Sequence, residues 1–190
     1  GAAGSSSGNI YNGKGGALYV GGNGLISTIA TDGTKNDAAL QNAVFTNNES
    51  LYGGALYKEA GKYKLDVSKT QFSGNRGYKD GGAAYNNGEL NFVLSANDNN
   101  IFVGNQAGND MSSIVSSGRG GAIYNAGNME ISVEEGTLKP ESVFVSNTAT
   151  GDDGQGGAIY NSSNLTVKGN ISFDKNSARK GGAIASSGTV

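Results

Sequence analysis

The sequence predicts an all-β protein, a right-handed parallel β-helix (solenoid) of about six rungs, with three short strands per rung and loop insertions at the corners. Three observations predict it: a Gly-Gly-Ala phrase recurs along the chain, a Phe-x-x-Asn phrase alternates with it, and a short apolar segment lies between them. Recurrence at a few tens of residues is typical of solenoids, whose units bury their apolar faces only against their neighbours. We therefore interpret residues 1–190 as a single β-helix.

The Gly-Gly-Ala phrase is usually followed by an aliphatic residue and tyrosine. Its six copies are Gly15-Gly16-Ala17-Leu18-Tyr19, Gly53-Gly54-Ala55-Leu56-Tyr57, Gly81-Gly82-Ala83-Ala84-Tyr85, Gly120-Gly121-Ala122-Ile123-Tyr124, Gly156-Gly157-Ala158-Ile159-Tyr160 and Gly181-Gly182-Ala183-Ile184-Ala185. A Gly-Gly pair before a strand suits a sharp corner that needs a positive φ and leaves no space for Cβ atoms beneath the next rung. Asparagine closes three copies, at Asn86, Asn125 and Asn161, where its amide can pair along the stack. A phosphate-binding glycine loop is excluded because no copy ends in Gly-Lys-Ser/Thr.

Two other segments complete each repeat. The Phe-x-x-Asn phrase occurs at Phe45–Asn48, Phe72–Asn75, Phe102–Asn105, Phe144–Asn147 and Phe173–Asn176. The short alternating segments, which predict half-buried strands, are Leu25–Ile29, Leu65–Val67, Leu90–Leu94, Met129–Val133 and Leu165–Val167. The longer intervals between Gly-Gly pairs place insertions at roughly 30–43, 106–119, 134–141 and 148–155. Corner loops are where a solenoid tolerates insertions.

Stacked rungs predict ladders of equivalent side chains inside the coil. One ladder contains Phe45, Phe72, Phe102, Phe144 and Phe173, and another contains Leu18, Leu56, Ile123, Ile159 and Ile184. Burying one such side chain is worth roughly 1.5–3 kcal/mol. We expect these ladders to be the main source of stability.

Composition excludes several function classes. The chain has 33 Gly, one Pro and no Cys, His or Trp, and its net charge is −2. Without Cys and His there are no Cys/His metal sites, disulfides, thiol nucleophiles or histidine bases. No basic patch suggests nucleic acid as a partner, and no apolar run approaches the ~20 residues of a membrane helix. We expect no cofactor, no metal and no direct membrane insertion.

The two alternating phrases resemble the polymorphic outer membrane protein repeat, whose marks are Gly-Gly-Ala-Ile and Phe-x-x-Asn, over about Ser7 to Ser187. The resemblance implies an autotransporter passenger domain, secreted or displayed on the bacterial outer membrane. It also implies a virulence-related adhesin that binds a protein or glycan on host or neighbouring cells. The sequence lacks the signal peptide and C-terminal membrane barrel of such proteins, so we expect a fragment of a longer passenger.

Tyrosines are the first candidate for partner binding. Tyr19, Tyr57, Tyr85, Tyr124 and Tyr160 follow the aliphatic position and so point to the opposite face of the strand. If the aliphatic residue is inside, they form an outward aromatic ladder, and aromatic rings with hydroxyl tips suit sugars and protein partners. The alternative is that the ladder stacks on itself or lies beneath the inserted loops. Under the binding hypothesis, replacing Tyr85, Tyr124 and Tyr160 with serine weakens binding and leaves the fold intact.

The inserted loops are the second candidate, because binding residues often lie on irregular segments held by a rigid scaffold. Asp110, Asp152 and Asp153 in two of these loops have the oxygen ligands that Ca²⁺ takes. Solvated acids are the simpler interpretation, because the sequence has neither an EF-hand loop nor a nonapeptide Ca²⁺ repeat.

Two other function classes compete with adhesion. β-Helices also carry polysaccharide lyases and hydrolases, which use clustered carboxylates. We expect the acids here to be scattered over inequivalent repeat positions, without a carboxylate pair, and so we expect no enzyme; they are Asp66, Asp80, Glu89, Glu130 and Asp174. The third class is a stalk or self-associating filament subunit, because exposed strand edges favour homo-association.

Overall fold

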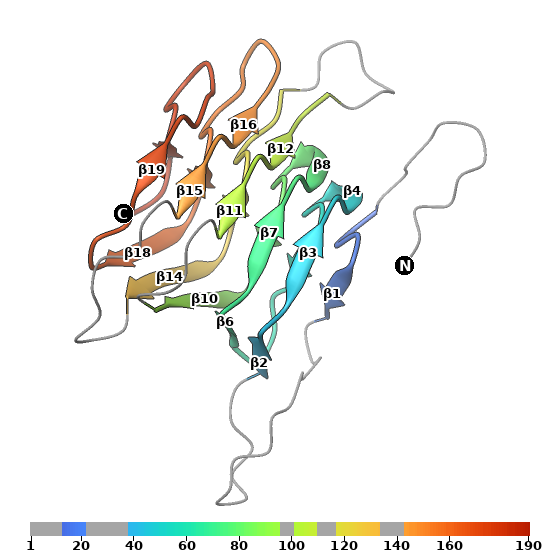
Figure 1. The fold of residues 1–190 in the computed structure, drawn as a ribbon, viewed down its shortest axis with the longest axis vertical. Coiled ribbons are helices and arrows are strands. Elements are labelled where there is room, and N and C mark those ends of the chain that lie inside the picture. The colour runs from blue at the N-terminus through green and yellow to red at the C-terminus, as the bar shows by residue number, and fades with distance from the viewer. Residues whose placement is uncertain (1–12, 22–37, 96–100, 110–116, 134–142) are drawn as a thin grey trace, which may run out of the picture.

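The computed structural model describes residues 13–21, 38–95, 101–109, 117–133 and 143–190. In these segments the chain coils through four parallel sheets in a fixed order, and the coils stack side by side (Figure 1). Sheet 1 consists of β1 (Leu18–Val20), β5 (Leu56–Lys58), β9 (Ala84–Asn86), β13 (Ile123–Asn125), β17 (Ile159–Asn161) and β20 (Ile184–Ser186). Sheet 2 consists of β2 (Ala38–Gln41), β6 (Leu65–Ser68), β10 (Glu89–Leu94), β14 (Asn128–Val133) and β18 (Asn164–Lys168).

The Phe-x-x-Asn segments supply the two remaining sheets. Sheet 3 consists of β3 (Val44–Thr46), β7 (Gln71–Ser73), β11 (Phe102–Val103), β15 (Phe144–Val145) and β19 (Phe173–Asp174). Sheet 4 consists of β4 (Glu49–Tyr52), β8 (Arg76–Asp80), β12 (Gln106–Ala107) and β16 (Thr148–Ala149). The predicted parallel β-helix is confirmed.

The structure differs from the sequence-based expectation in two details. A full rung has four strands instead of three, because the chain forms a further strand directly after four of the five Phe-x-x-Asn corners; after Asn176 only a single bridge, at Ser177, takes its place. With two residues each, β12 and β16 are too short to show alternation in the sequence, and they begin the stretches 106–119 and 148–155 that we assigned to insertions. Sheet 2 begins with β2 inside the stretch 30–43 that we assigned to an insertion, and Ala38 and Leu40 align with Leu65 and Val67. The predicted strand Leu25–Ile29 lies outside the described residues.

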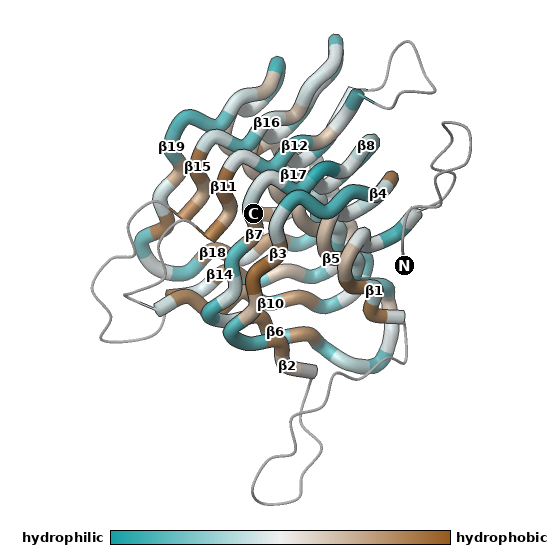
Figure 2. Tube along the Cα trace, turned by 45° about the vertical axis from the view of Figure 1, so that its right-hand side comes forward, coloured by the Kyte–Doolittle hydropathy of each residue, from teal (hydrophilic) through white to brown (hydrophobic). Residues whose placement is uncertain are grey.

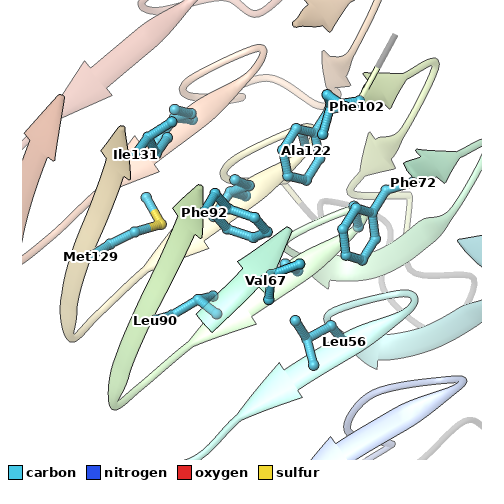
Figure 3. Close-up of a cluster of buried hydrophobic side chains, with 14 of the residues drawn as sticks. Leu56, Val67, Phe72, Leu90, Phe92, Phe102, Ala122, Met129 and Ile131 are labelled. Carbon is cyan, nitrogen blue, oxygen red and sulfur yellow. The ribbon is translucent and has the colours of Figure 1, made fainter. Parts of the chain in front are cut away.

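The interior is a continuous apolar core, and hydrophobic residues recur at matching places on successive coils (Figure 2). Both predicted ladders are present. The phenylalanine rings stack with centroids 4.7 to 5.2 Å apart from Phe45 to Phe173. The aliphatic residues of sheet 1 align in register, with Ala84 in the third rung. Figure 3 shows Phe72 and Phe102 pointing toward Phe92, which meets both rings edge-on and joins sheet 2 to the phenylalanine ladder.

The asparagine of Phe-x-x-Asn forms the corner between sheets 3 and 4. Asn105 is fully buried, and its Nδ2 donates to Asn147 Oδ1 (2.9 Å) and to the Phe72 carbonyl (3.0 Å). Its Oδ1 accepts hydrogen bonds from the backbone N–H and Nδ2 of Asn75, both at 3.0 Å. Bonds of this kind join Asn48, Asn75, Asn105, Asn147 and Asn176 into one ladder. The residue before each of these asparagines has a positive φ, at Asn47, Gly74, Gly104, Ser146 and Lys175.

The two glycines of each Gly-Gly pair have different roles. Gly120 has a φ of 68°, a left-handed conformation that glycine adopts without strain. A Cβ on Gly121 would lie against the carbonyl oxygen of Gly157 in the next rung. The positive φ and the crowding predicted for this corner are therefore both present, one at each glycine.

The asparagine that closes the Gly-Gly-Ala phrase forms a second buried ladder. Asn86 Nδ2 donates to Asn125 Oδ1 (2.8 Å), and Asn125 Nδ2 donates to Asn161 Oδ1 (2.7 Å). In the preceding rung the same register position is occupied by Lys58, which is 1% exposed and whose Nζ donates to the Glu59 carbonyl (2.7 Å). The ammonium thus stands at the end of the asparagine column, and burial lowers the pKa of Lys58.

Candidate functional site

The structure brings all five predicted tyrosines together on the outward side of sheet 1. They are register partners in successive strands, and their rings are stacked with centroids 4.6 to 5.7 Å apart; they are Tyr19, Tyr57, Tyr85, Tyr124 and Tyr160. The stacking that we weighed as the alternative to an open ladder is therefore present. The role of these residues in partner binding stays a prediction.

Exposure differs along this tyrosine ladder. Tyr19 is 47% exposed, whereas Tyr57, Tyr124 and Tyr160 are 5%, 6% and 8% exposed and Tyr85 is intermediate. Only one end of the ladder offers a whole ring face to solvent, within the part of the chain that the structure describes. A partner that binds elsewhere along the ladder meets ring edges, hydroxyl groups and the side chains that cover them.

The cover is a second outward ladder, which we call the pre-glycine ladder because each member directly precedes a Gly-Gly pair. Its members are bridged in parallel from rung to rung: Lys14, Tyr52, Asp80, Arg119, Gln155 and Lys180. The Lys14 ammonium lies 4.8 Å from the ring centroid of Tyr57, and Tyr52 meets Tyr85 edge-on at 5.5 Å. Among the described residues, the groups over the rings come from the pre-glycine corner, and one of them, Arg119, is the last residue of the stretch 106–119 that we assigned to an insertion.

Arg119 is the central member of the pre-glycine ladder. Its guanidinium lies 4.8 Å from the centroid of Tyr124 and 5.5 Å from that of Tyr160. Nε and Nη2 donate to the two carboxylate oxygens of Asp80 at 3.0 and 2.8 Å, a bidentate pair. The hydrogen bonds to Asp80, which is 1% exposed, raise the pKa of Arg119. Burial similarly raises the pKa of Tyr85, so its phenol stays neutral.

A polar cluster surrounds the exposed end of the tyrosine ladder. The Tyr19 hydroxyl and Lys14 Nζ both donate to the Glu59 carboxylate, and these bonds lower the pKa of Glu59. The hydrogen bond to Glu59 raises the pKa of Tyr19. These bonds hold the Tyr19 ring in one orientation, and they pair the charges of Lys14 and Glu59 with each other.

A shallow groove on the outward face of sheet 2 is a site that sequence reasoning missed. It has a volume of about 250 Å³ and crosses β10, β14 and β18; its lining residues are Lys64, Glu89, Asn91, Asn128, Met129, Glu130, Asn164 and Thr166. We expected the acids to be inequivalent, but Asp66, Asn91 and Glu130 are register partners in successive rungs. Asp66 and Glu130 therefore occupy equivalent positions, which the sequence hid because the intervals between rungs differ in length.

The predicted loop acids are only partly described. Asp153 forms an ion pair with Lys180 and accepts a hydrogen bond from Gln155 Nε2 (2.9 Å). These bonds, from Lys180 first, lower the pKa of Asp153. Asp152 is exposed beside it, and Asp110 lies outside the described residues. In the described segments no helix is long and apolar enough to cross a bilayer.

Four sheets of stacked parallel strands with in-register side-chain ladders define the chain as a β-helical repeat protein. Residues 101–126, 141–162 and 170–187 match the family model of the Chlamydia polymorphic membrane protein repeat, each from a Phe-x-x-Asn corner to just past a Gly-Gly-Ala strand. The chain thus contains repeats of the polymorphic outer membrane protein family, which the sequence predicted. The family is one of surface-exposed proteins of the outer membrane or cell surface. Comparisons with curated proteins and with solved structures gave no match.

Proposed function

We propose that the chain belongs to a non-enzymatic, adhesin-type passenger that is displayed on or secreted from a bacterial surface and binds a protein or glycan on host or neighbouring cells. The observation that carries the proposal is the match of three rungs to a repeat of surface-exposed membrane proteins. The architecture supports it, because continuous backbone and asparagine ladders make a rigid scaffold on which outward groups keep fixed positions.

Two surfaces outside sheet 2 are candidates for binding the protein or glycan on the other cell. The first is the tyrosine ladder with its pre-glycine cover, where Tyr19 offers an open ring. The second is the loop after β16, where Gly151, Asp152 and Asp153 are exposed. Serine at the stacked tyrosines would remove buried rings as well as any contact. Substitutions that keep the buried rings and remove only their hydroxyl groups are therefore the sharper test.

The test measures attachment of the purified chain, coupled to fluorescent beads, to cultured epithelial cells and to bacteria. One variant combines Tyr19→Ser with Tyr124→Phe and Tyr160→Phe, and a second combines Asp152→Ser with Asp153→Ser. Gln71→Ala on the exposed face of sheet 3 is the matched control. If the contact lies on one of these two surfaces, the corresponding variant loses most of its attachment while the control retains it; full attachment by both variants moves the contact to sheet 2. If the folded wild-type chain attaches no better than uncoated beads, the adhesin proposal is wrong.

One observation favours a second candidate, a polysaccharide-active enzyme. Glu89 and Glu130 line the same groove, so two carboxylates face one surface. New reducing or unsaturated ends after incubation with polysaccharides would support this activity, and their loss in Glu130→Gln would assign it to the groove.

The continuity of the ladders also suits a stalk that holds another domain away from the cell. Sedimentation over a wide concentration range tests the self-associating form of this role. A strict monomer would contradict it.

A further inference from the structure

We infer that the groove on sheet 2 binds a neutral, linear glycan whose chain runs along the stack of rungs. This inference rests on the proposed adhesin function and names its ligand class. The groove crosses successive strands, and its walls repeat with the rung spacing of about 4.8 Å, comparable with the length of one pyranose unit. The repeating columns are Glu89, Asn128 and Asn164, and Asn91, Glu130 and Thr166.

The polar side chains of the groove are held in place by bonds to one another. Asn164 Nδ2 donates to Asn128 Oδ1 (2.9 Å), and Lys168 Nζ donates to Glu130 Oε2 (2.8 Å). Asn91 Nδ2 donates to Asp66 Oδ1 (3.0 Å) beside the groove. Fixed amide and carboxylate groups suit hydroxyl recognition, because the ligand then orders few protein side chains on binding.

The chemistry of the lining favours a glycan over a protein segment. The backbone groups beneath the groove are bonded within sheet 2, so an extended peptide has no strand edge to join there. Met129 is the single apolar lining residue and is 3% exposed, which leaves no aromatic or aliphatic anchor of the kind that protein interfaces use.

The charges of the lining favour an uncharged glycan. Glu89, Glu130 and Lys64 line the groove, and both cations of this region form ion pairs, Lys64 with Asp66 and Lys168 with Glu130. A uronate or sulfate group would meet these carboxylates and be repelled. Neutral sugars can instead donate their hydroxyl groups to the carboxylates and accept from the amides of Asn91 and Asn128.

The experiment is a glycan array probed with the full chain, followed by calorimetric titration of the neutral hexasaccharide that binds best. Variants Asn128→Ala and Glu130→Gln change the groove, and Gln71→Ala on sheet 3 is the control. Circular dichroism and thermal unfolding establish that each variant is folded. We expect binding to neutral linear glycans, at least tenfold weaker in either groove variant and unchanged in the control.

Three results would overturn the inference: no binding to neutral glycans, preference for sulfated or uronate glycans, or equal binding by the groove variants. Cell attachment measured in parallel separates this inference from the proposed function. Attachment that persists without glycan binding eliminates the groove but leaves the adhesin role to the tyrosine ladder or the loops. Loss of both eliminates the adhesin proposal as well.

Discussion

The phenylalanine and tyrosine ladders use the same stacking on opposite sides of the backbone. Ring centroids lie 4.7 to 5.2 Å apart in the phenylalanine ladder and 4.6 to 5.7 Å apart in the tyrosine ladder. The phenylalanines pack in the apolar core, whereas the tyrosines lie under the charged and polar pre-glycine ladder. The spacing between rungs therefore sets the ring stacking in both ladders. The ladders differ in what surrounds the rings, the apolar core for phenylalanine and the polar outer side of sheet 1 for tyrosine.

The two ladders also differ in how far the residues beside them vary from rung to rung. Beside the phenylalanines, an asparagine recurs at every corner because its side chain bonds to the rungs on either side, with the same four hydrogen bonds at Asn75, Asn105 and Asn147. Over the tyrosines, the pre-glycine position changes from lysine to tyrosine, aspartate, arginine and glutamine. The asparagine corner is thus fixed by the bonds that it makes to its neighbours, whereas the pre-glycine position accepts several residue types.

The largest effect is expected inside the core. Phe102→Ala removes a fully buried ring between Phe72 and Phe144, and it should lower the free energy of unfolding by about 3–5 kcal/mol. Tyr124→Ala should cost less, because water can enter the space left on the outward side. Urea unfolding followed by circular dichroism measures both, and equal losses would contradict the distinction between the two ladders.

The next largest effect is expected at the asparagine corner. Asn105→Ala leaves the buried Asn75 N–H without its partner and removes one of the two hydrogen bonds that Asn147 Oδ1 accepts, at a cost of about 2–3 kcal/mol. Asn128→Ala is the matched control, because this asparagine is exposed on sheet 2. A thermal unfolding series on the two variants should show a large shift for the first and almost none for the second. Similar shifts would mean that the buried ladder is no more important than a surface amide.

The ladders of the fold were predictable from sequence because they repeat. Phe102 and Asn105 have counterparts in four other rungs, so their stacking and burial follow from alignment of the chain with itself. The two-residue strand β12 was not predictable, since alternation needs a longer segment. The candidate sites were predicted only in part: the tyrosines repeat, but Asp80 and Arg119 share no residue type, and unequal insertions hid the equivalence of Asp66 and Glu130.

A smaller loss of stability is expected from substitutions in the pre-glycine ladder. Asp80→Asn removes the carboxylate that holds Arg119 over the tyrosines, and it should lower the free energy of unfolding by about 1–2 kcal/mol. The cost stays below that of a fully buried pair because the Arg119 side chain is 36% exposed and remains partly solvated. Lys168→Ala breaks an exposed ion pair and should cost less than about 0.5 kcal/mol. Urea unfolding distinguishes the two, and equal costs would mean that the cover contributes no more than a surface pair.

The last effect is expected where the second asparagine ladder ends in a lysine, and it is a pH dependence of the free energy of unfolding. Burial lowers the pKa of Lys58 below its ordinary value of 10.5, so the unfolded chain binds more protons than the folded chain between the two pKa values. The free energy of unfolding of the wild type should therefore rise with pH in that window. Lys58→Asn places the amide of the next three rungs at this position and should abolish the rise.

The measurement for Lys58→Asn is urea unfolding between pH 7.5 and 9.5. The range stays below the ordinary pKa of tyrosine, because the raised pKa of Tyr85 makes stability fall with pH once unfolded tyrosines ionise. Lys168→Asn removes an exposed lysine and should retain the slope of the wild type. If the Lys58 and Lys168 variants have the same slope, the buried ammonium carries no cost. The asparagine ladder would then accept a charge at its end as readily as an amide.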